Sequence, residues 1–503
     1  MSDEPNSNTG LSTGLNTVGE TSMIRPLGHL ETFKSSLHLL RQHCGTAVSC
    51  RYSLPESLQF EAAQDALLRA VAQTVMDHPI MQAGLGNEDS SRPHWIRLDT
   101  IHLENHITWH TVQESDVCHD CLEQAIATQI HTWFTDLETK PGWRVHVLRQ
   151  ENTKQLTVIF CWNHAFFDGM SAKIFHQTLL KHLNSGTARQ DLPFLKDSVI
   201  HLQDPSTNFP PPTEALRTIQ VTLWFTLKTV WRELFPAFLV PSNPFDAHWA
   251  PVKTDPYNTN SRLIRVSDED LRKILSACRK HETTLTGILN VLPLFSLAEQ
   301  LEGKVQALSS VMAIDIRRFM PCRPEAFPWY DPHSSMENKV SLVDDDFDAD
   351  LLTAVQTACK SAASKDAAMT QLEETMWRLA ARTRQKLQEK LDSDLYNDPS
   401  GLMAYVADWR AQMKSKTTKP RARSWGVTNL GTFADAEPGW KIDDAVFKLS
   451  AEVNASVFHI SVVSVRGGDL CVDVGWQEGI IDPKIGDRLA ADMESWLRYL
   501  ARA

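Results

Sequence analysis

One short stretch of the chain combines a histidine, an aspartate and a glycine at fixed spacing: His164, Asp168 and Gly169. An imidazole has an ordinary pKa near about 6.5, so His164 is a plausible general base at neutral pH. Asp168 cannot easily reach the same reacting atom across a turn, so we expect it to support His164 through a buried charge pair or hydrogen bonds. Gly169 removes a side chain where the backbone bends or a substrate comes close. A histidine that is simply hydrogen-bonded at a strand end is the alternative.

The flanking sequence predicts a strand before this motif and a helix after it. Residues 156–161 form an apolar run, and residues 172–183 place apolar side chains at helical spacing. A second strand-like segment, residues 143–149, precedes a polar turn, which predicts a hairpin that carries His164 at its end. Ser171 is well placed to cap the helix.

Two distant segments accompany the Trp-Asn-His and Asp-Gly residues of the motif. Residues 25–31 read Arg-Pro-Leu-Gly-His-Leu-Glu, and residues 426–431 read Gly-Val-Thr-Asn-Leu-Gly. The His-x-x-x-Asp-Gly pattern between strand and helix resembles the active-site motif of the chloramphenicol acetyltransferase-like superfamily, which includes peptide-synthetase condensation domains. With its two companions, the chain most resembles the fungal alcohol O-acetyltransferase family, over about residues 24–500.

This resemblance implies an α/β protein with two similar domains, each a mixed sheet covered by helices, and a substrate channel between them. A chain of 503 residues is long enough for two domains. We expect a tail over residues 1–22, an N-terminal domain with the motif over 23–190, a proline-rich crossover over 191–260 and a C-terminal domain over 261–503.

The resemblance also implies partners for the motif. An arginine on a strand of the second domain pairs with the motif aspartate in the superfamily, and Arg317 matches that position, with Arg318 as the second choice. Both arginines could instead end a strand in solvent. Thr428 and Asn429 are candidates for contacts to substrate or oxyanion, because a tetrahedral intermediate needs fixed donors. An ordinary Asn-Leu-Gly turn is the alternative there.

The most basic short stretch of the chain is a candidate for binding the phosphates of coenzyme A. Its members are Lys414, Lys416, Lys419, Arg421 and Arg423. The alternative is a solvated loop, which is the usual fate of a charge run.

Residues 213–235 form the strongest helix candidate of the crossover. Lys228, Arg232 and Glu233 argue against a membrane span, which needs about 20 nearly uncharged residues. A helix buried between domains, or covering a tunnel, is one interpretation. Peripheral contact with a membrane surface is the other, because aromatic residues and a cationic fringe favour it.

Composition restricts the classes of function. With a net charge of -12, the chain lacks the overall positive charge that nucleic-acid binding requires. Nine cysteines without regular spacing predict a reducing compartment, and residues 1–22 contain no secretory apolar core, so we expect a cytoplasmic protein. Cys118 and Cys121 have half of a zinc spacing but no second pair follows, so no metal is expected.

The residues and the resemblance together predict an acyltransferase. Acetyl-CoA or another acyl-CoA would donate a short acyl group to the hydroxyl of a hydrophobic alcohol, a secondary metabolite, with His164 as general base. We expect a monomer. Two alternatives remain open: a condensation-like or cyclising enzyme on the same fold, and a non-catalytic member that binds a hydrophobic ligand.

Overall fold

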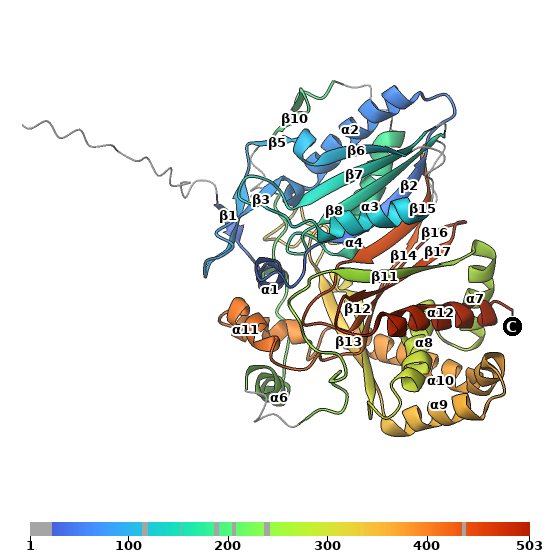
Figure 1. Cartoon of the computed structure of the whole chain (residues 1–503). Helices are drawn as coiled ribbons and strands as arrows, with labels where there is room; N and C mark the ends of the chain where they lie inside the picture. The colour runs from blue at the N-terminus through green and yellow to red at the C-terminus, as the bar shows by residue number, and fades with distance from the viewer. Residues whose placement is uncertain are drawn as a thin grey trace, which may run out of the picture.

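The computed structural model describes residues 23–112, 119–151, 153–185, 191–203, 208–235, 242–434 and 439–502. The tail expected over residues 1–22 and Cys118 of the cysteine pair lie outside this part. The described chain forms two large sheets, one above the other in Figure 1, with helices packed on both.

The first sheet has five strands in the order β15-β2-β8-β7-β6. Its strands are β2 (Thr46–Ser53), β6 (Ile107–Val112), β7 (Trp143–Gln150), β8 (Gln155–Trp162) and β15 (Lys441–Leu449). The predicted hairpin is confirmed, because β7 and β8 pair antiparallel. β15 comes from near the end of the sequence and pairs antiparallel with β2; Figure 1 shows the two side by side.

Helices cover both faces of the first sheet. They are α2 (Phe60–Asp77), α3 (His119–His131) and α4 (Gly169–Asn184). Phe160 of β8 stacks on Phe175 of α4 at 4.0 Å between ring centroids, whereas the next residue, Cys161, contacts the Gln129 carbonyl of α3. Successive strand residues point to opposite faces, so α4 and α3 lie on opposite sides of the sheet.

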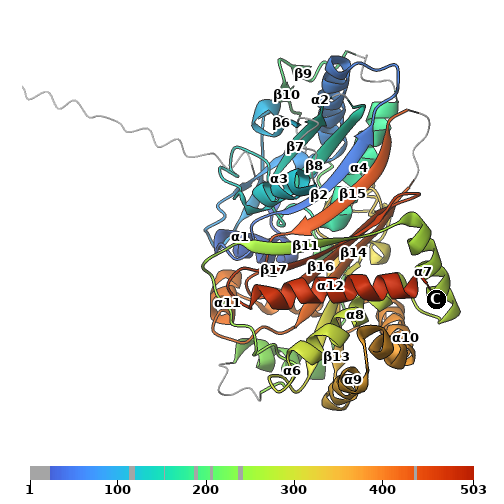
Figure 2. The same ribbon diagram turned by 45° about the vertical axis from the view of Figure 1, so that its right-hand side comes forward.

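The second sheet has six strands in the order β11-β17-β16-β14-β12-β13. These are β11 (Thr259–Val266), β12 (Leu308–Asp315), β13 (Val340–Phe347), β14 (Trp425–Phe433), β16 (Phe458–Val465) and β17 (Leu470–Gln477). Its helices are α7 (Asp268–Lys280), α8 (Leu285–Gln300), α9 (Ala349–Ser361), α10 (Lys365–Asp392) and α12 (Pro483–Leu500). Figure 2 shows α12 lying along this sheet.

Smaller elements surround the two sheets. One three-stranded sheet contains β1 (Met23–Pro26), β4 (His94–Arg97) and β3 (Ala83–Gly86), and the other contains β5 (Thr100–His102), β10 (Val199–His201) and β9 (Leu195–Lys196). The remaining α-helices are α1 (His29–Leu39), α5 (Thr213–Leu216), α6 (Leu223–Leu234) and α11 (Trp409–Lys416). In the described ranges, 3-10 turns span Pro79–Gln82, Leu103–Asn105, Arg317–Phe319 and Pro399–Tyr405.

The single helix predicted over residues 213–235 is wrong, because the structure splits it into α5 and α6. Between them the chain is extended and bonds to Asn397: the Asn397 N–H donates to the Gln220 carbonyl, and the Thr222 N–H donates to Asn397 Oδ1. The Thr222 hydroxyl then accepts from the Phe225 N–H and starts α6. These tertiary bonds replace the helical ones that the periodicity predicts.

Candidate active site

The motif lies in the tight connection between β8 and α4. The Trp162 indole donates to the Phe167 carbonyl at 2.8 Å, and the Asn163 side chain accepts from the Ala165 N–H at 2.9 Å. Asn163 and Trp162 are fully buried. These bonds fix the path of the chain, so His164 stands at a defined point beyond the end of the strand.

Asp168 is buried and meets the guanidinium of Arg317 in a two-point contact. Arg317 Nη1 lies 2.7 Å from Asp168 Oδ2, and Nη2 lies 3.0 Å from Oδ1. The Lys339 N–H and the Ser171 N–H also donate to this carboxylate. Burial alone would raise the pKa of Asp168, but the charge and hydrogen bonds of Arg317 outweigh it and hold that pKa below its usual range. Asp168 is therefore a carboxylate fixed in place.

Asp168, rather than Ser171, caps the following helix. Its carboxylate accepts from the Ser171 N–H at 2.9 Å, which makes it the N-cap of α4 and corrects the expectation for Ser171. The Ser171 hydroxyl instead lies 2.7 Å from the Glu337 carbonyl, between the helix and the segment before β13. The aspartate can accept both the helix donor and the arginine because a carboxylate has two oxygens.

Arg317 reaches the motif from the second sheet. It belongs to the 3-10 turn after β12 rather than to the strand itself, and it also donates to Asp315 at 3.1 Å and to the Glu337 carbonyl at 2.8 Å. Arg318, the second choice, is exposed. The pair therefore joins the His164 connection to the other half of the molecule.

His164 is surrounded by polar groups that shift its proton equilibrium. Burial lowers its pKa to about 4, with the positive charge of Lys34 acting in the same direction and Glu452 opposing it. The Asn338 amide donates to the His164 carbonyl at 2.5 Å and lies 3.2 Å from Nδ1. The imidazole is consequently neutral at physiological pH.

Four residues near His164 have no counterpart in the sequence prediction: Asn338, His43, Lys34 and Glu452. The His43 ring centroid lies 5.5 Å from that of His164, and His43 Nε2 is buried without a hydrogen-bond partner. Lys34 of α1 pairs with Glu452 at 3.1 Å. Lys34 and His43 lie near the start of the sequence, whereas Asn338 and Glu452 lie far along it, and no spacing rule connects the two groups. The sequence motif over residues 25–31 runs into α1, the helix that carries Lys34, and is the feature of the sequence that lies nearest to this group.

Gly169 allows β14 to approach the motif. A Cβ on Gly169 would lie 2.6 Å from Leu430 Cδ2, so an alanine would collide with that side chain. Lys173 of α4 also donates to the Leu430 carbonyl at 3.1 Å. The late segment predicted from the sequence therefore packs directly against the Asp-Gly turn.

Thr428 and Asn429 belong to β14, and both are partly buried. Asn429 donates to the Thr286 hydroxyl at 3.0 Å and accepts from the Gly431 N–H at 2.8 Å. Gly431 has a φ of 71°, which favours glycine, and the register with β16 is interrupted between Asn429 and Thr432. Asn429 is thus engaged in the turn.

The side chains of the basic stretch fall into two groups: some pair with other protein groups, and others lie near solvent. Arg421 is buried and donates to Gln477 Oε1 at 2.8 Å, and Arg423 pairs with Asp344 at 2.6 Å. Lys416 pairs with Glu233 at 2.9 Å, whereas Lys414 is exposed. These contacts make Arg421 a structural residue and leave the lysines nearer to solvent.

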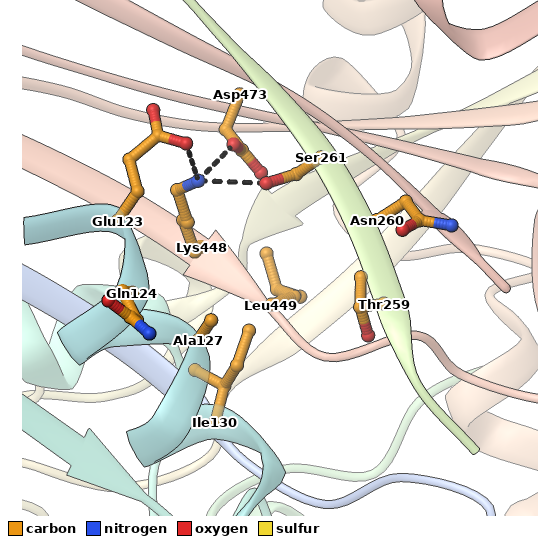
Figure 3. A pocket seen from close by; sticks show the side chains of 10 residues that line it. All are labelled: Glu123, Gln124, Ala127, Ile130, Thr259, Asn260, Ser261, Lys448, Leu449 and Asp473. Carbon is orange, nitrogen blue, oxygen red and sulfur yellow. Dashed lines mark hydrogen bonds and ion pairs between the residues drawn. The ribbon is translucent and has the colours of Figure 1, made fainter. Parts of the chain in front are cut away.

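A cavity of about 230 Å³ lies between α3, β11, β15 and β17 (Figure 3), and no residue of the motif lines it. At one side of it the Lys448 ammonium lies 3.0 Å from Asp473 and 2.8 Å from the Ser261 hydroxyl, with Glu123 at 3.6 Å. Lys448 is thus already neutralised by protein carboxylates. Within the described ranges, no group of three or more His, Cys, Asp or Glu side chains could hold a metal ion.

Residues 112–331 match the family described as alcohol acetyltransferase. The chain is 26% identical over 498 residues to the probable alcohol acetyltransferase FCK4 of Fusarium pseudograminearum, over 95% of this chain and 96% of that one. It is 24% identical over 474 residues to the probable alcohol acetyltransferase crmB of Aspergillus fumigatus, over 90% of this chain and 95% of that one.

Solved structures share the fold across nearly the whole chain. The trichothecene 15-O-acetyltransferase TRI3 of Fusarium sporotrichioides superposes with a TM-score of 0.67 at 12% identity, over 94% of each chain. The condensation domain of the monacolin K polyketide synthase MokA superposes with a TM-score of 0.59 at 11% identity, over 95% of this chain and 97% of that one. The predicted fold, two pseudo-domains of the chloramphenicol acetyltransferase-like type, is confirmed.

Proposed function

The chain belongs to the alcohol acetyltransferase family and is an acetyltransferase, and from this we propose that it moves an acetyl or other short acyl group from acyl-CoA to the hydroxyl of a hydrophobic alcohol. One observation supports this proposal above the others. The neutral His164 stands on a connection that the Asp168–Arg317 pair fastens to the second sheet. A base fixed in this way is suited to a reaction in which two substrates meet at one point.

In the proposed reaction, His164 Nε2 removes the proton of the alcohol as its oxygen attacks the thioester carbonyl. The resulting tetrahedral intermediate expels the thiolate of coenzyme A, and the imidazolium returns the proton to that sulfur. In this proposal Nδ1 carries the ring hydrogen and Nε2 is the basic nitrogen. Thr428 and Asn429 are proposed to contact the substrate or its oxyanion. No acyl-enzyme forms.

The binding of the two substrates is also a proposal. An acyl-CoA and an alcohol would enter a channel between the two pseudo-domains. We place their boundaries in the sequence at about residues 190 and 260, except that β15 returns to the first sheet. Of the basic stretch, Lys414, Lys416, Lys419 and Arg423 are proposed to attract the phosphates of acetyl-CoA, with Arg421 shaping their segment. The protein would work as a cytoplasmic monomer on a secondary metabolite, without a metal.

The test is thiol release from acetyl-CoA with a panel of hydrophobic alcohols and amines. Wild type is compared with His164→Ala and with His333→Ala, which removes an exposed histidine elsewhere. We expect wild type and His333→Ala to release thiol and form an ester, and His164→Ala to lose about 100-fold or more in kcat/KM. Equal melting temperatures for the three proteins would show that a loss of activity reflects the missing imidazole and not unfolding.

Two outcomes would contradict the proposal. If His164→Ala retains full activity, His164 is not the base. If wild type accepts no acyl-CoA but transfers from a carrier-linked thioester, the condensation-like alternative is correct.

A further inference from the structure

Helix α6 presents large apolar side chains to solvent. Ten large hydrophobic residues are exposed in the described part of the chain, and five of them fall within the 13 residues from Leu223 to Phe235. Their exposed fractions are 75% for Leu223, 76% for Trp224, 55% for Leu227, 45% for Trp231 and 36% for Phe235. Such a concentration is typical of a surface that binds a partner protein or a membrane.

These five side chains share one face of the helix. Successive residues turn by about 100°, so they occupy a stripe of about 120°. Lys228 and Arg232 follow at the edge of the stripe, and both are exposed. Trp231 stacks on Phe235 at 4.3 Å between ring centroids. The helix therefore offers an apolar stripe bordered by two cations.

Contacts on its other side hold α6 in this orientation. Glu233, the only acidic residue of the helix, pairs with Lys416 of α11 at 2.9 Å, and its carbonyl accepts from Lys419 at 2.8 Å. Figures 1 and 2 both show α6 close to α11 at one end of the molecule. Because Glu233 is neutralised, the outward surface of α6 is positive although the whole chain carries a net charge of -12.

We propose that α6 docks on the surface of a membrane that contains anionic lipids. Trp, Leu and Phe side chains would enter the headgroup boundary, while Lys228 and Arg232 contact lipid phosphates. A second copy of the chain fits this surface less well, since pairing two α6 faces would bring cationic edges together without a free carboxylate on either helix. Among the described helices, none is long and apolar enough to cross a membrane.

The docking helix is connected to the candidate active site by the segment before it. Lys339, whose N–H donates to Asp168, extends its ammonium to the Pro211 carbonyl at 3.2 Å. Leu216 and Ile219 pack against the cluster that contains Ile316, next to Arg317. Docking would thus be linked to the site through this segment, and a hydrophobic alcohol concentrates at a lipid surface. This use of the surface rests on the proposed function, whereas docking itself does not.

The test is co-sedimentation of the full chain with phosphatidylcholine vesicles, with and without phosphatidylserine. We expect wild type to bind the anionic vesicles and release them at high salt. The double substitution Trp224→Ala and Trp231→Ala should lower the bound-to-free ratio about tenfold or more, because it removes the inserted rings. Lys228→Glu with Arg232→Glu should abolish the preference for phosphatidylserine. Trp329→Ala, which removes a tryptophan 41% exposed on another segment, is the matched control and should bind as wild type does.

Three results would overturn the inference: no binding of wild type to either vesicle, an equal loss in Trp329→Ala, or a dimer in sedimentation velocity that the Trp224 and Trp231 substitutions dissociate. The assay contains no substrate, so its outcome is independent of catalysis. Conversely, turnover of a water-soluble alcohol should be unchanged in the α6 variants, and its absence in wild type would count only against the proposed function.

Discussion

The Asp168–Arg317 pair combines a high desolvation cost with nearly ideal geometry. Both side chains are buried, and removing an ion from water costs several kcal/mol. The two parallel contacts and the added N–H donors of Lys339 and Ser171 offset this cost. The pair holds the motif in position more than it adds net stability.

Loss of one partner should therefore be more damaging than a conservative change. Arg317→Met leaves Asp168 charged and unpaired, so we expect a loss of about 3–5 kcal/mol in the free energy of unfolding. Arg317→Lys keeps the charge but not the two-point contact, and should lower kcat/KM about 10- to 100-fold with a smaller loss of stability. Urea unfolding and thiol release measure the two effects. Arg318→Lys, at the exposed neighbour, should change neither; if it matches Arg317→Lys, the geometric argument fails.

The pH dependence of catalysis should report the environment of His164. In the proposed reaction the neutral imidazole is the base, so activity should be present above its pKa and lost as pH falls through it. The acidic limb of kcat/KM is therefore expected near pH 4. Lys34→Met removes a charge that lowers this pKa and should move the limb to higher pH, whereas Glu452→Gln should move it to lower pH. A limb unmoved by both substitutions would exclude His164 as the titrating group.

The Gly169–Leu430 contact gives a prediction about how α4 and β14 pack. An added methyl at Gly169 would overlap Leu430, so Gly169→Ala should destabilise the protein by about 1–3 kcal/mol. Leu430→Ala alone opens a cavity and costs about 2–5 kcal/mol, since Leu430 is buried. Together the two changes should cost at least 1 kcal/mol less than their sum. Simple additivity in urea unfolding would show that the two residues do not compete for space.

How far the sequence predicts these elements depends on the range of the interactions that form them. The hairpin of β7 and β8 and the presence of a helix after the motif follow from local periodicity and turn residues, although α4 begins at Gly169, before the expected cap Ser171. The break between α5 and α6 depends on Asn397, more than 170 residues away, and could not be read from residues 213–235 alone. In the same way, nothing near β15 indicates that this strand joins the first sheet beside β2.

The same limit applies to the candidate site. Asp168 and Arg317 could be paired in advance because a buried carboxylate needs a cation and the family resemblance pointed to a strand end. Asn338 and His43 are ordinary polar residues in their own segments, and only the folded chain brings them to His164. The motif and its flanking strand and helix follow from local patterns, whereas the polar environment of His164 depends on the packing of the two halves.

Both halves of the molecule contain buried histidines, which should make its stability depend on mildly acidic pH. Burial lowers the pKa of five of them to about 4: His78, His106, His164, His176 and His459. In the unfolded chain a histidine titrates near about 6.5, so the unfolded state binds more protons between these values. The contribution of these histidines to stability is fully present above pH 6.5 and decreases as pH falls towards 4, by up to about 3 kcal/mol at a fully buried position such as His176.

His176 offers a way to test this at one position. Its Nδ1 lies 2.9 Å from the Tyr52 hydroxyl and its Nε2 lies 3.2 Å from the Val48 carbonyl, which a neutral ring satisfies. His176→Gln should be less stable than wild type at pH 7, because the packing changes, but should lose about 3 kcal/mol less on acidification from pH 7 to 4, since one titrating group is gone. Urea unfolding at several pH values measures the difference. Parallel curves for the two proteins would mean that His176 does not remain neutral in the fold, and that the acid sensitivity arises from the carboxylates instead.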